Sequence, residues 1–214
     1  WNSVYILGVA EMYDMYGSVD YIKEQYTTMS KFADYVMRRI RANRWVCPDG
    51  QLGDWVSPMG NNPNAGYVES PSEGSGIVGT AFVYKMYEEL ARMAELIGQN
   101  DDAIQYRTYM SSIYDAFNAK FYNEEKGIYE TTVWTQYGTR TRYRQTSNIV
   151  PLAFNMVPDE YRETVIKNLI ADIESKDNHL DTGCVGTKSI LPVLTDLGYG
   201  ELAYTITNQT TYPS

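Results

Sequence analysis

Cysteine and histidine are scarce in this sequence. The 214 residues include two cysteines, Cys47 and Cys184, and one histidine, His179. This scarcity excludes a disulfide framework and a zinc site with paired-cysteine spacing, and one imidazole cannot form a histidine-rich metal centre. Phosphate-binding loops, a GxSxG nucleophile elbow and metal-binding helix motifs are also missing. We therefore expect no metal and no organic cofactor.

Positive charge and long hydrophobic runs are equally scarce. Lysine and arginine total 18 against 27 acidic residues, and the net charge is -9. Such a chain repels the phosphate groups of nucleic acids and of anionic membranes. No apolar run approaches the roughly 18 residues of a membrane span. The composition predicts a globular protein that has neither a nucleic acid nor a membrane as its partner.

Aromatic residues, in contrast, are abundant. The chain has 20 tyrosines, 5 phenylalanines and 4 tryptophans. Aromatic rings fill protein cores, and in an acidic protein they also suit stacking on neutral ligands. Composition alone leaves both roles open.

Apolar residues recur at the three-and-four spacing of a helix face along most of the chain. One such stripe runs from Val83 to Ile97, and another from Tyr106 to Phe121. Strand alternation is confined to one short candidate hairpin between Ile128 and Arg144. The predicted fold class is all-α, with helices over residues 4–16, 19–42, 76–97, 101–121, 145–156, 159–175, 187–197 and 200–209.

Short joints separate several of these predicted helices. Gly17, Gly98 and Gly198 each follow an apolar stripe, and an acidic residue stands three positions after each of them. A left-handed glycine ends a helix, and acidic groups favour the positive end of the next one. Paired in this way, the helices form about four αα-hairpins, as in an α-solenoid or an α/α toroid. No composition break marks a boundary, so we expect residues 1–214 to form a single unit.

Two long connections interrupt this array, from Asn43 to Ser75 and from Asn123 to Arg144. Loops of such length are commonly functional. The first contains Gly53-Asp54-Trp55, in which close backbone approach, a carboxylate and a flat indole together suit a bound sugar. An Asx-type turn with a tryptophan anchored in the core is the alternative.

A second polar loop, from His179 to Thr187, leads into a predicted helix. It is either a binding loop or only a helix cap formed by Thr182 or Thr187. Glycoside hydrolysis uses a pair of carboxyl groups, one acting as acid and one as base or nucleophile. The loop carboxylates that can serve in such a pair are Asp54, Glu69, Glu73 and Asp181.

In their order and spacing, these segments resemble the catalytic domain of the α-L-rhamnosidases of glycoside hydrolase family 78, nearly from one end of the chain to the other. The residues that carry the resemblance include Trp1, Tyr16-Gly17, Tyr26-Thr27-Thr28-Met29, Gly53-Asp54-Trp55, Asp115-Ala116-Phe117-Asn118, Gln145-Thr146-Ser147-Asn148, Leu180-Asp181-Thr182-Gly183 and Tyr212-Pro213-Ser214. The resemblance implies a partial (α/α)6 barrel, the six-hairpin glycosidase toroid. It also implies that this chain is the central piece of a longer catalytic domain.

The resemblance further implies an enzyme that inverts the anomeric carbon while it removes terminal α-L-rhamnose, so the expected partner is a carbohydrate, a rhamnoside. The family's general acid precedes the position of Trp1 and its base follows the position of Ser214, so no catalytic residue is expected in this chain. Ser3 departs from the family, which usually has aspartate there. The residues that the resemblance assigns to the sugar pocket are Trp1, Asp54, Trp55, His179 and Asp181, and we expect the Asp54 and Asp181 loops to lie side by side.

Two alternatives remain open. Another α/α-barrel carbohydrate enzyme, such as an unsaturated glucuronyl hydrolase, would use Asp54 as its acid. A non-catalytic α-solenoid binding module would be favoured if Asp54 and Trp55 were buried and no pocket held Trp1 together with Trp55.

An incomplete toroid would also expose apolar flanks and self-associate through them. The residues expected on these flanks are Val4, Leu7, Val9, Met12, Ile190, Leu191 and Leu194.

Overall fold

The structure is a computed structural model that describes residues 2–48, 53–54, 58, 61–62, 67–68, 75–135 and 138–212. In these residues the chain forms eight helices and five strands, and the helices dominate, which confirms the predicted fold class. The chain divides into two compact units. Unit 1 comprises Trp1–Pro48 and Gly79–Phe117, and unit 2 comprises Asp49–Val78 and Asn118–Ser214. That residues 1–214 belong to a single domain stays a prediction.

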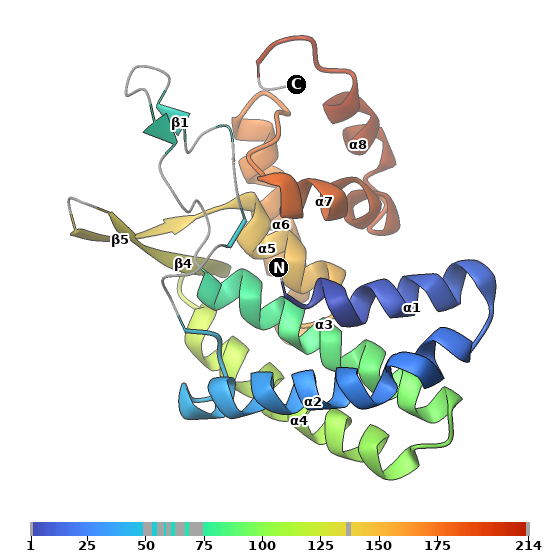
Figure 1. Ribbon diagram of the computed structural model, residues 1–214. Coiled ribbons are helices and arrows are strands. Elements are labelled where there is room, and N and C mark those ends of the chain that lie inside the picture. The colour runs from blue at the N-terminus through green and yellow to red at the C-terminus, as the bar shows by residue number, and fades with distance from the viewer. Residues whose placement is uncertain are drawn as a thin grey trace. The chain divides into compact units, whose positions relative to one another are not determined.

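Long helices make up unit 1 (Figure 1). They are α1 (Val4–Tyr16), α2 (Asp20–Ala42), most of α3 (Ser75–Leu96) and most of α4 (Asn100–Phe121). Gly17 ends α1 with a left-handed φ of 68°, and its N–H donates to the Tyr13 carbonyl. Gly98 takes a φ of 80° between α3 and α4. The glycine joints predicted from the sequence are therefore confirmed at both positions.

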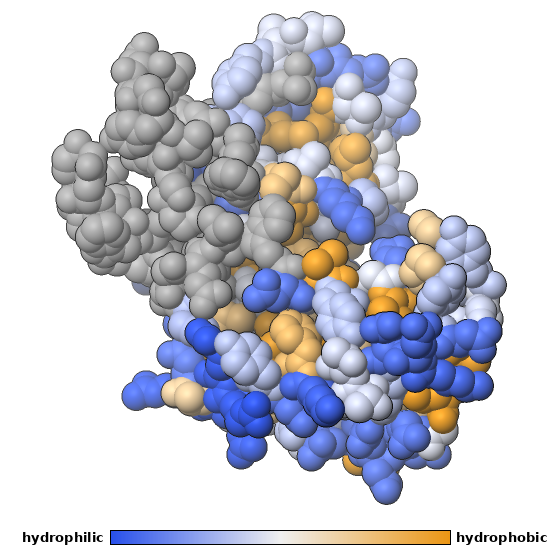
Figure 2. Space-filling model, in the orientation of Figure 1, coloured by the Kyte–Doolittle hydropathy of each residue, from blue (hydrophilic) through white to orange (hydrophobic). Residues whose placement is uncertain are grey.

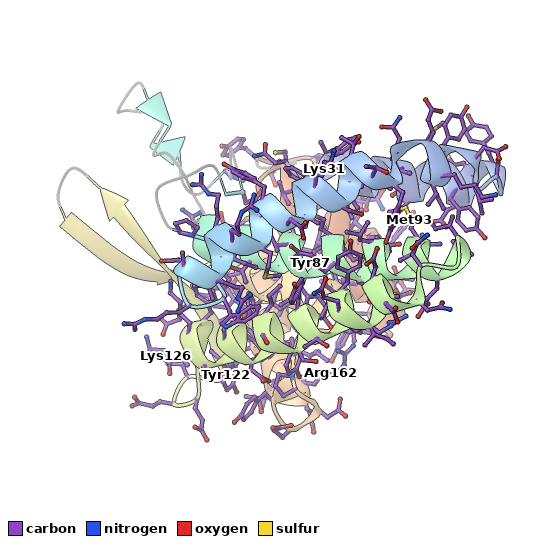
Figure 3. All side chains as sticks on the ribbon, turned by 60° about the horizontal axis from the view of Figure 1, so that its bottom comes forward. Lys31, Tyr87, Met93, Tyr122, Lys126 and Arg162 are labelled. Carbon is purple, nitrogen blue, oxygen red and sulfur yellow. The ribbon has the colours of Figure 1, made fainter. Side chains whose placement is uncertain are left out.

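A buried tyrosine ties three helices of unit 1 together. Tyr87 of α3 is 0% exposed, and its hydroxyl donates to the Ala33 carbonyl of α2 at 2.7 Å. Its ring lies 5.8 Å from that of Tyr106 and 5.7 Å from that of Tyr109, both on α4. Figure 3 shows Tyr87 between the ribbons of α2 and α4. Part of the tyrosine content of this chain thus serves core packing.

Unit 2 is organised around a short central helix (Figure 1). Its helices are α5 (Gln145–Ala153), α6 (Asp159–Ser175), α7 (Cys184–Asp196) and α8 (Gly200–Thr207). α5 packs against α6, α7 and strand β4, and α7 packs against α8. Gly198 makes the α7–α8 joint with a φ of 87°, as predicted.

Two antiparallel hairpins accompany these helices. The strands are β1 (Asn61–Asn62), β2 (Tyr67–Val68), β3 (Tyr122–Asn123), β4 (Ile128–Thr135) and β5 (Gly138–Tyr143). β4 pairs with β5, with Glu130 opposite Tyr143, which confirms the hairpin predicted between residues 128 and 144. β3 extends this sheet beside β4, and the β1–β2 pair was not predicted.

The first turn of α5 is polar and fully buried. Gln145, Thr146, Ser147 and Asn148 are all 0% exposed, and every residue from 145 to 152 is buried. A buried polar side chain is destabilising unless it has hydrogen-bond partners within the protein. The start of α5 is therefore a place where distant segments of unit 2 must converge.

Helix boundaries differ from the predicted ones by more than one residue at three places. α7 begins at Cys184 instead of residue 187, because its first turn is capped by a residue from elsewhere in the chain. α5 ends at Ala153 instead of residue 156, since Asn155 adopts a positive φ of 52°. α8 ends at Thr207 instead of residue 209.

The expectation that Ile190 and Leu194 lie on an exposed apolar flank is wrong. Both side chains are 0% exposed, because α7 packs against α5 and α8 within unit 2. On α1, Val4 is 70% exposed, whereas Leu7 and Met12 are half-buried. Of these three residues of the expected stripe, only Val4 is strongly exposed.

On the face in view, Figure 2 shows mostly hydrophilic residues over α2, with smaller apolar areas between them. None of the described helices combines the length and the apolar character that a membrane crossing requires.

Candidate functional site

The Asp54 carboxylate lies at the N-terminus of α7, and the residue is 0% exposed. Its Oδ2 accepts hydrogen bonds from the Gly183 N–H at 2.6 Å and from the Thr146 hydroxyl at 2.5 Å. Its Oδ1 accepts from the N–H groups of Val185 at 2.8 Å and Gly186 at 3.4 Å. Asp54 therefore caps a helix whose N-cap residue, Gly183, stands 129 positions later in the sequence.

The local sequence explains why α7 needs this cap. The first N–H groups of a helix have no partner within the helix, and Gly183 has no side chain that could accept from them. The same helix end carries the positive end of the helix dipole, which favours an anion. A buried carboxylate, for its part, needs donors that replace water. The two requirements satisfy each other, which anchors Asp54 on α7.

The threonines predicted as caps have other partners. Thr187 lies inside the first turn of α7, where its hydroxyl donates to the Gly183 carbonyl at 2.8 Å. The Thr182 hydroxyl oxygen lies 2.8 Å from that of Thr187. The prediction of Thr182 or Thr187 as the capping residue is therefore wrong, because the cap comes from a distant loop.

Residues at the start of α5 hold the polar loop that precedes α7. Gln145 Oε1 accepts from the Asp181 N–H at 2.7 Å, and Gln145 Nε2 donates to the His179 carbonyl at 3.3 Å. Arg144 Nη1 donates to Asp181 Oδ1 at 3.1 Å, and both of these side chains are buried. Through Thr146, the same helix start also holds Asp54. One short segment thus fixes both candidate loops.

Asp181 lies between two cations. Besides Arg144, Lys176 Nζ is 3.7 Å from Asp181 Oδ2, and it lies 2.5 Å from Asp172 Oδ1 near the end of α6. Asp172 Oδ2 also accepts from Gln145 Nε2 at 3.2 Å. Buried ion pairs persist where such additional hydrogen bonds satisfy them.

In the described part of the chain, no group of three or more His, Cys, Asp or Glu side chains is arranged to hold a metal ion.

The single histidine joins this loop to the C-terminal segment. His179 Nδ1 lies 2.9 Å from the Lys176 carbonyl oxygen, which can only accept a hydrogen bond. Nδ1 therefore donates this bond, and Nε2 lies within hydrogen-bond distance of the Thr211 hydroxyl oxygen, at 2.9 Å. Gln209 Nε2 reinforces the junction by donating to the Asp177 carbonyl at 3.0 Å. These contacts hold the loop against the C-terminal segment.

α5 and α7 approach each other closely where Asp54 inserts. A Cβ added at Gly186 would lie 2.2 Å from Thr146 Oγ1, which is shorter than any tolerated contact. Thr146 is the residue that donates to Asp54. Glycine at position 186 is therefore required for Asp54, Thr146 and α7 to meet.

The structure brings three of the five predicted site residues into one region of unit 2. Asp54 bonds Gly183, two residues after Asp181, and His179 lies in the same loop. Trp1 and Trp55 lie outside the described residues. The residues that sequence reasoning missed are Arg144, Gln145, Thr146 and Lys176. One signal was available, since an unbroken polar run at the start of an otherwise apolar helix has no solvent-facing pattern.

Comparison with known proteins identifies the class of this fold. All 214 residues match the bacterial α-L-rhamnosidase six-hairpin glycosidase domain. An α-L-rhamnosidase of Formosa agariphila is 27% identical over 214 residues, which are 100% of this chain and 21% of that protein. One from Streptomyces avermitilis is 26% identical and is matched over 100% of this chain and 18% of its own length.

Solved structures agree with the sequence relatives. The α-L-rhamnosidase from Dictyoglumus thermophilum has a TM-score of 0.85 and 33% identity, over 100% of this chain and 22% of that one. The Streptomyces avermitilis α-L-rhamnosidase complexed with L-rhamnose has a TM-score of 0.73 and 27% identity, over 93% of this chain and 17% of that one.

The fold is thus part of a six-hairpin glycosidase domain. More specifically, the chain belongs to the bacterial α-L-rhamnosidase six-hairpin glycosidase family, which confirms the resemblance found in the sequence. It spans about a fifth of the length of the relatives that it matches.

Proposed function

We propose that the protein containing this chain is an inverting α-L-rhamnosidase, which removes terminal α-L-rhamnose from glycosides or polysaccharides. The observation that carries the proposal is the match of all 214 residues to the rhamnosidase six-hairpin domain. The similarity to the Streptomyces avermitilis α-L-rhamnosidase complexed with L-rhamnose supports the choice of sugar. The chain covers about a fifth of such proteins, so the activity belongs to the longer protein.

In this proposal the chain shapes the sugar pocket and supplies no proton-transfer residue. Trp1 and Trp55 stack on the sugar, with Asp54 and the loop carrying His179 and Asp181 beside them. An inverting pair of carboxyl groups is about 6.5 to 9.5 Å apart and leaves room for a water molecule. The geometry supports a different task for the two described carboxylates, since Asp54 accepts four hydrogen bonds and Asp181 is paired with Arg144.

The glucuronyl hydrolase alternative requires Asp54 to donate a proton. All four contacts described above are donors to Asp54, and a carboxylic acid would direct its own proton at one of them. The burial of Asp54 meets only part of the first condition set for the α-solenoid alternative, because Trp55 and Trp1 lie outside the described residues. This alternative gains no support from the family match, whose relatives are named as rhamnosidases.

The direct test is hydrolysis of 4-nitrophenyl α-L-rhamnopyranoside by the full-length protein and by residues 1–214 alone. We expect turnover only by the full-length protein, because loss of general acid or base assistance typically costs about 10² to 10⁴ in rate for each group. The first product seen by NMR should be β-L-rhamnose, as inversion requires. Turnover by residues 1–214 that is abolished by Asp54→Asn would instead support the alternative acid.

Binding of the sugar is tested separately. In the full-length protein, Trp55→Ala should raise KM about tenfold or more, as expected for the loss of a good stacking partner. Trp45→Phe is a matched control, since Trp45 packs against Tyr109 in unit 1. Equal KM values for wild type and Trp55→Ala would remove Trp55 from the proposed pocket.

A further inference from the structure

Three segments that are far apart in the sequence meet at the carboxylate of one residue. Asp54 belongs to the long loop after α2, Thr146 to the first turn of α5, and Gly183 with Val185 to the start of α7. The sequence places Trp55 directly after Asp54. The contacts that hold Asp54 therefore act one residue before Trp55 in the sequence.

We propose that Asp54 is a positioning residue of the rhamnoside site. Its buried carboxylate ties residues 53–54 to α5 and α7, and it neither transfers a proton nor contacts the sugar. The part of this inference that concerns the sugar rests on the proposed function. The anchoring of α7 does not.

The geometry of the hydrogen bonds carries the proposal. A carboxylate that binds a sugar hydroxyl, or exchanges a proton with a glycosidic oxygen, must present an oxygen to the ligand. Each Asp54 oxygen instead accepts two bonds from the protein, and the residue is 0% exposed. Three of these four donors are backbone N–H groups at a helix end. Their directions are fixed by the helix, so they cannot rotate away from Asp54.

Two substitutions at Asp54 should weaken the cap to different degrees. Asparagine replaces one carboxylate oxygen with an NH2 group and keeps the other, whereas alanine removes both. In Asp54→Asn, the oxygen still accepts from one pair of donors, and the amide nitrogen opposes the other pair. The Thr146 hydroxyl can rotate, but the N–H groups of Gly183, Val185 and Gly186 cannot. Asp54→Asn should therefore weaken the cap and Asp54→Ala should remove it.

Thr146 offers a milder pair of variants. Thr146→Val removes the hydrogen bond to Asp54 while it preserves shape and leaves the three backbone bonds of α7 in place. Thr146→Ser keeps the hydroxyl. Both variants retain the three backbone hydrogen bonds between α7 and Asp54. Their comparison therefore measures the hydrogen bond between α5 and Asp54 separately.

The first experiment measures hydrogen–deuterium exchange by mass spectrometry in the full-length protein, in peptides that cover residues 183–190. We expect Asp54→Ala to raise exchange in the first turn of α7 about tenfold, with a smaller rise for Asp54→Asn. Asp159→Ala is the matched control, because Asp159 is an exposed acid in the first turn of α6 and its loss should leave α7 unchanged. Unchanged exchange in Asp54→Ala would overturn the anchoring.

The second experiment compares a rhamnoside that has a good leaving group, the 4-nitrophenyl glycoside, with one that has a poor leaving group, the methyl glycoside. A positioning role predicts that Asp54→Asn raises KM about tenfold for both and leaves the ratio of their kcat values unchanged. Thr146→Val should give a smaller rise, and Thr146→Ser should restore the wild-type KM.

Two outcomes would contradict this inference in different ways. If Asp54→Asn lowers kcat about 10² to 10⁴ for the methyl glycoside and little for the 4-nitrophenyl glycoside, then Asp54 is the general acid and the positioning role is wrong. If the wild-type protein hydrolyses neither rhamnoside, the proposed function fails together with the sugar part of the inference. The exchange experiment still decides the anchoring in that case.

Discussion

The two units of this chain bury their interiors with different kinds of side chain. Unit 1 packs long helices through apolar and tyrosine side chains, as at Tyr87. Unit 2 buries Arg144, Asp181 and the polar first turn of α5, and Arg144, Gln145, Thr146 and Asp181 each bond to a segment far away in the sequence. An apolar interior tolerates substitutions that conserve side-chain volume, whereas a buried polar network requires every hydrogen-bond partner to be in place. Substitutions should therefore be more damaging in unit 2.

The largest expected effect comes from breaking the buried ion pair of unit 2. Arg144→Met leaves the buried charge of Asp181 without its closest cation, and should lower the free energy of unfolding by about 3 to 5 kcal/mol. Urea titration followed by circular dichroism measures this change. The control is Arg107→Met in unit 1, whose partner Glu95 is 48% exposed, with an expected loss of about 0 to 1 kcal/mol. Similar losses in the two variants would abolish the contrast between the units.

Replacing one glycine by alanine in each unit should change the stability in opposite directions. Gly186→Ala forces a Cβ to 2.2 Å from Thr146 Oγ1, and should destabilise unit 2 by about 1 to 3 kcal/mol. Gly8→Ala, within α1, meets nothing within 4 Å and should stabilise unit 1 by about 0.5 to 1 kcal/mol. Thermal unfolding of both variants decides the matter. A destabilising Gly8→Ala would show that unit 1 is packed as tightly as the α5–α7 contact.

A smaller effect is expected from a buried hydroxyl in unit 1. Tyr87→Phe removes the bond to the Ala33 carbonyl but leaves the ring contacts, so the expected loss is about 0.5 to 1.5 kcal/mol. Urea titration at pH 7 measures it. A loss as large as that of Arg144→Met would mean that unit 1 also depends on a polar network.

The smallest effect appears only at alkaline pH. Burial, followed by a hydrogen bond to Asp102, raises the pKa of Tyr26 above its ordinary value of 10.0, and burial likewise raises the pKa of Tyr87. Since the pKa values are higher in the folded protein, the stability from these groups is complete below pH 10 and is lost as the pH rises above it. The free energy of unfolding should therefore fall between pH 10 and pH 12, and less steeply in Tyr26→Phe. An equal slope in wild type and Tyr26→Phe would rule out this contribution.

Local pattern was enough to predict most of the helices. α1 and α6 match their predicted bounds, and α2, α3 and α4 differ from theirs by a residue or less at each end. The hairpin of β4 and β5 was also predicted. Helix periodicity, left-handed glycines and strand alternation are all properties of neighbouring residues, so a single sequence displays them.

The candidate site was only partly predictable. The sequence pointed to Asp54 and Asp181 because they stand in polar loops beside glycines, and the structure places them in one region. It missed Arg144 and Gln145 as their partners, since a buried polar run does not show in the sequence which distant segments it contacts. Their burial depends on α6 and α7, which lie later in the chain.

By itself, then, the sequence determined the helical class, the glycine joints and the rhamnosidase family. Only the tertiary structure decided where α7 begins and what Asp54 does. A helix cap requires an acceptor within hydrogen-bond distance of its first N–H groups, and for α7 that acceptor stands 129 positions before Gly183. No local pattern encodes a pairing over such a separation, because it exists only after α5 and α7 have packed together.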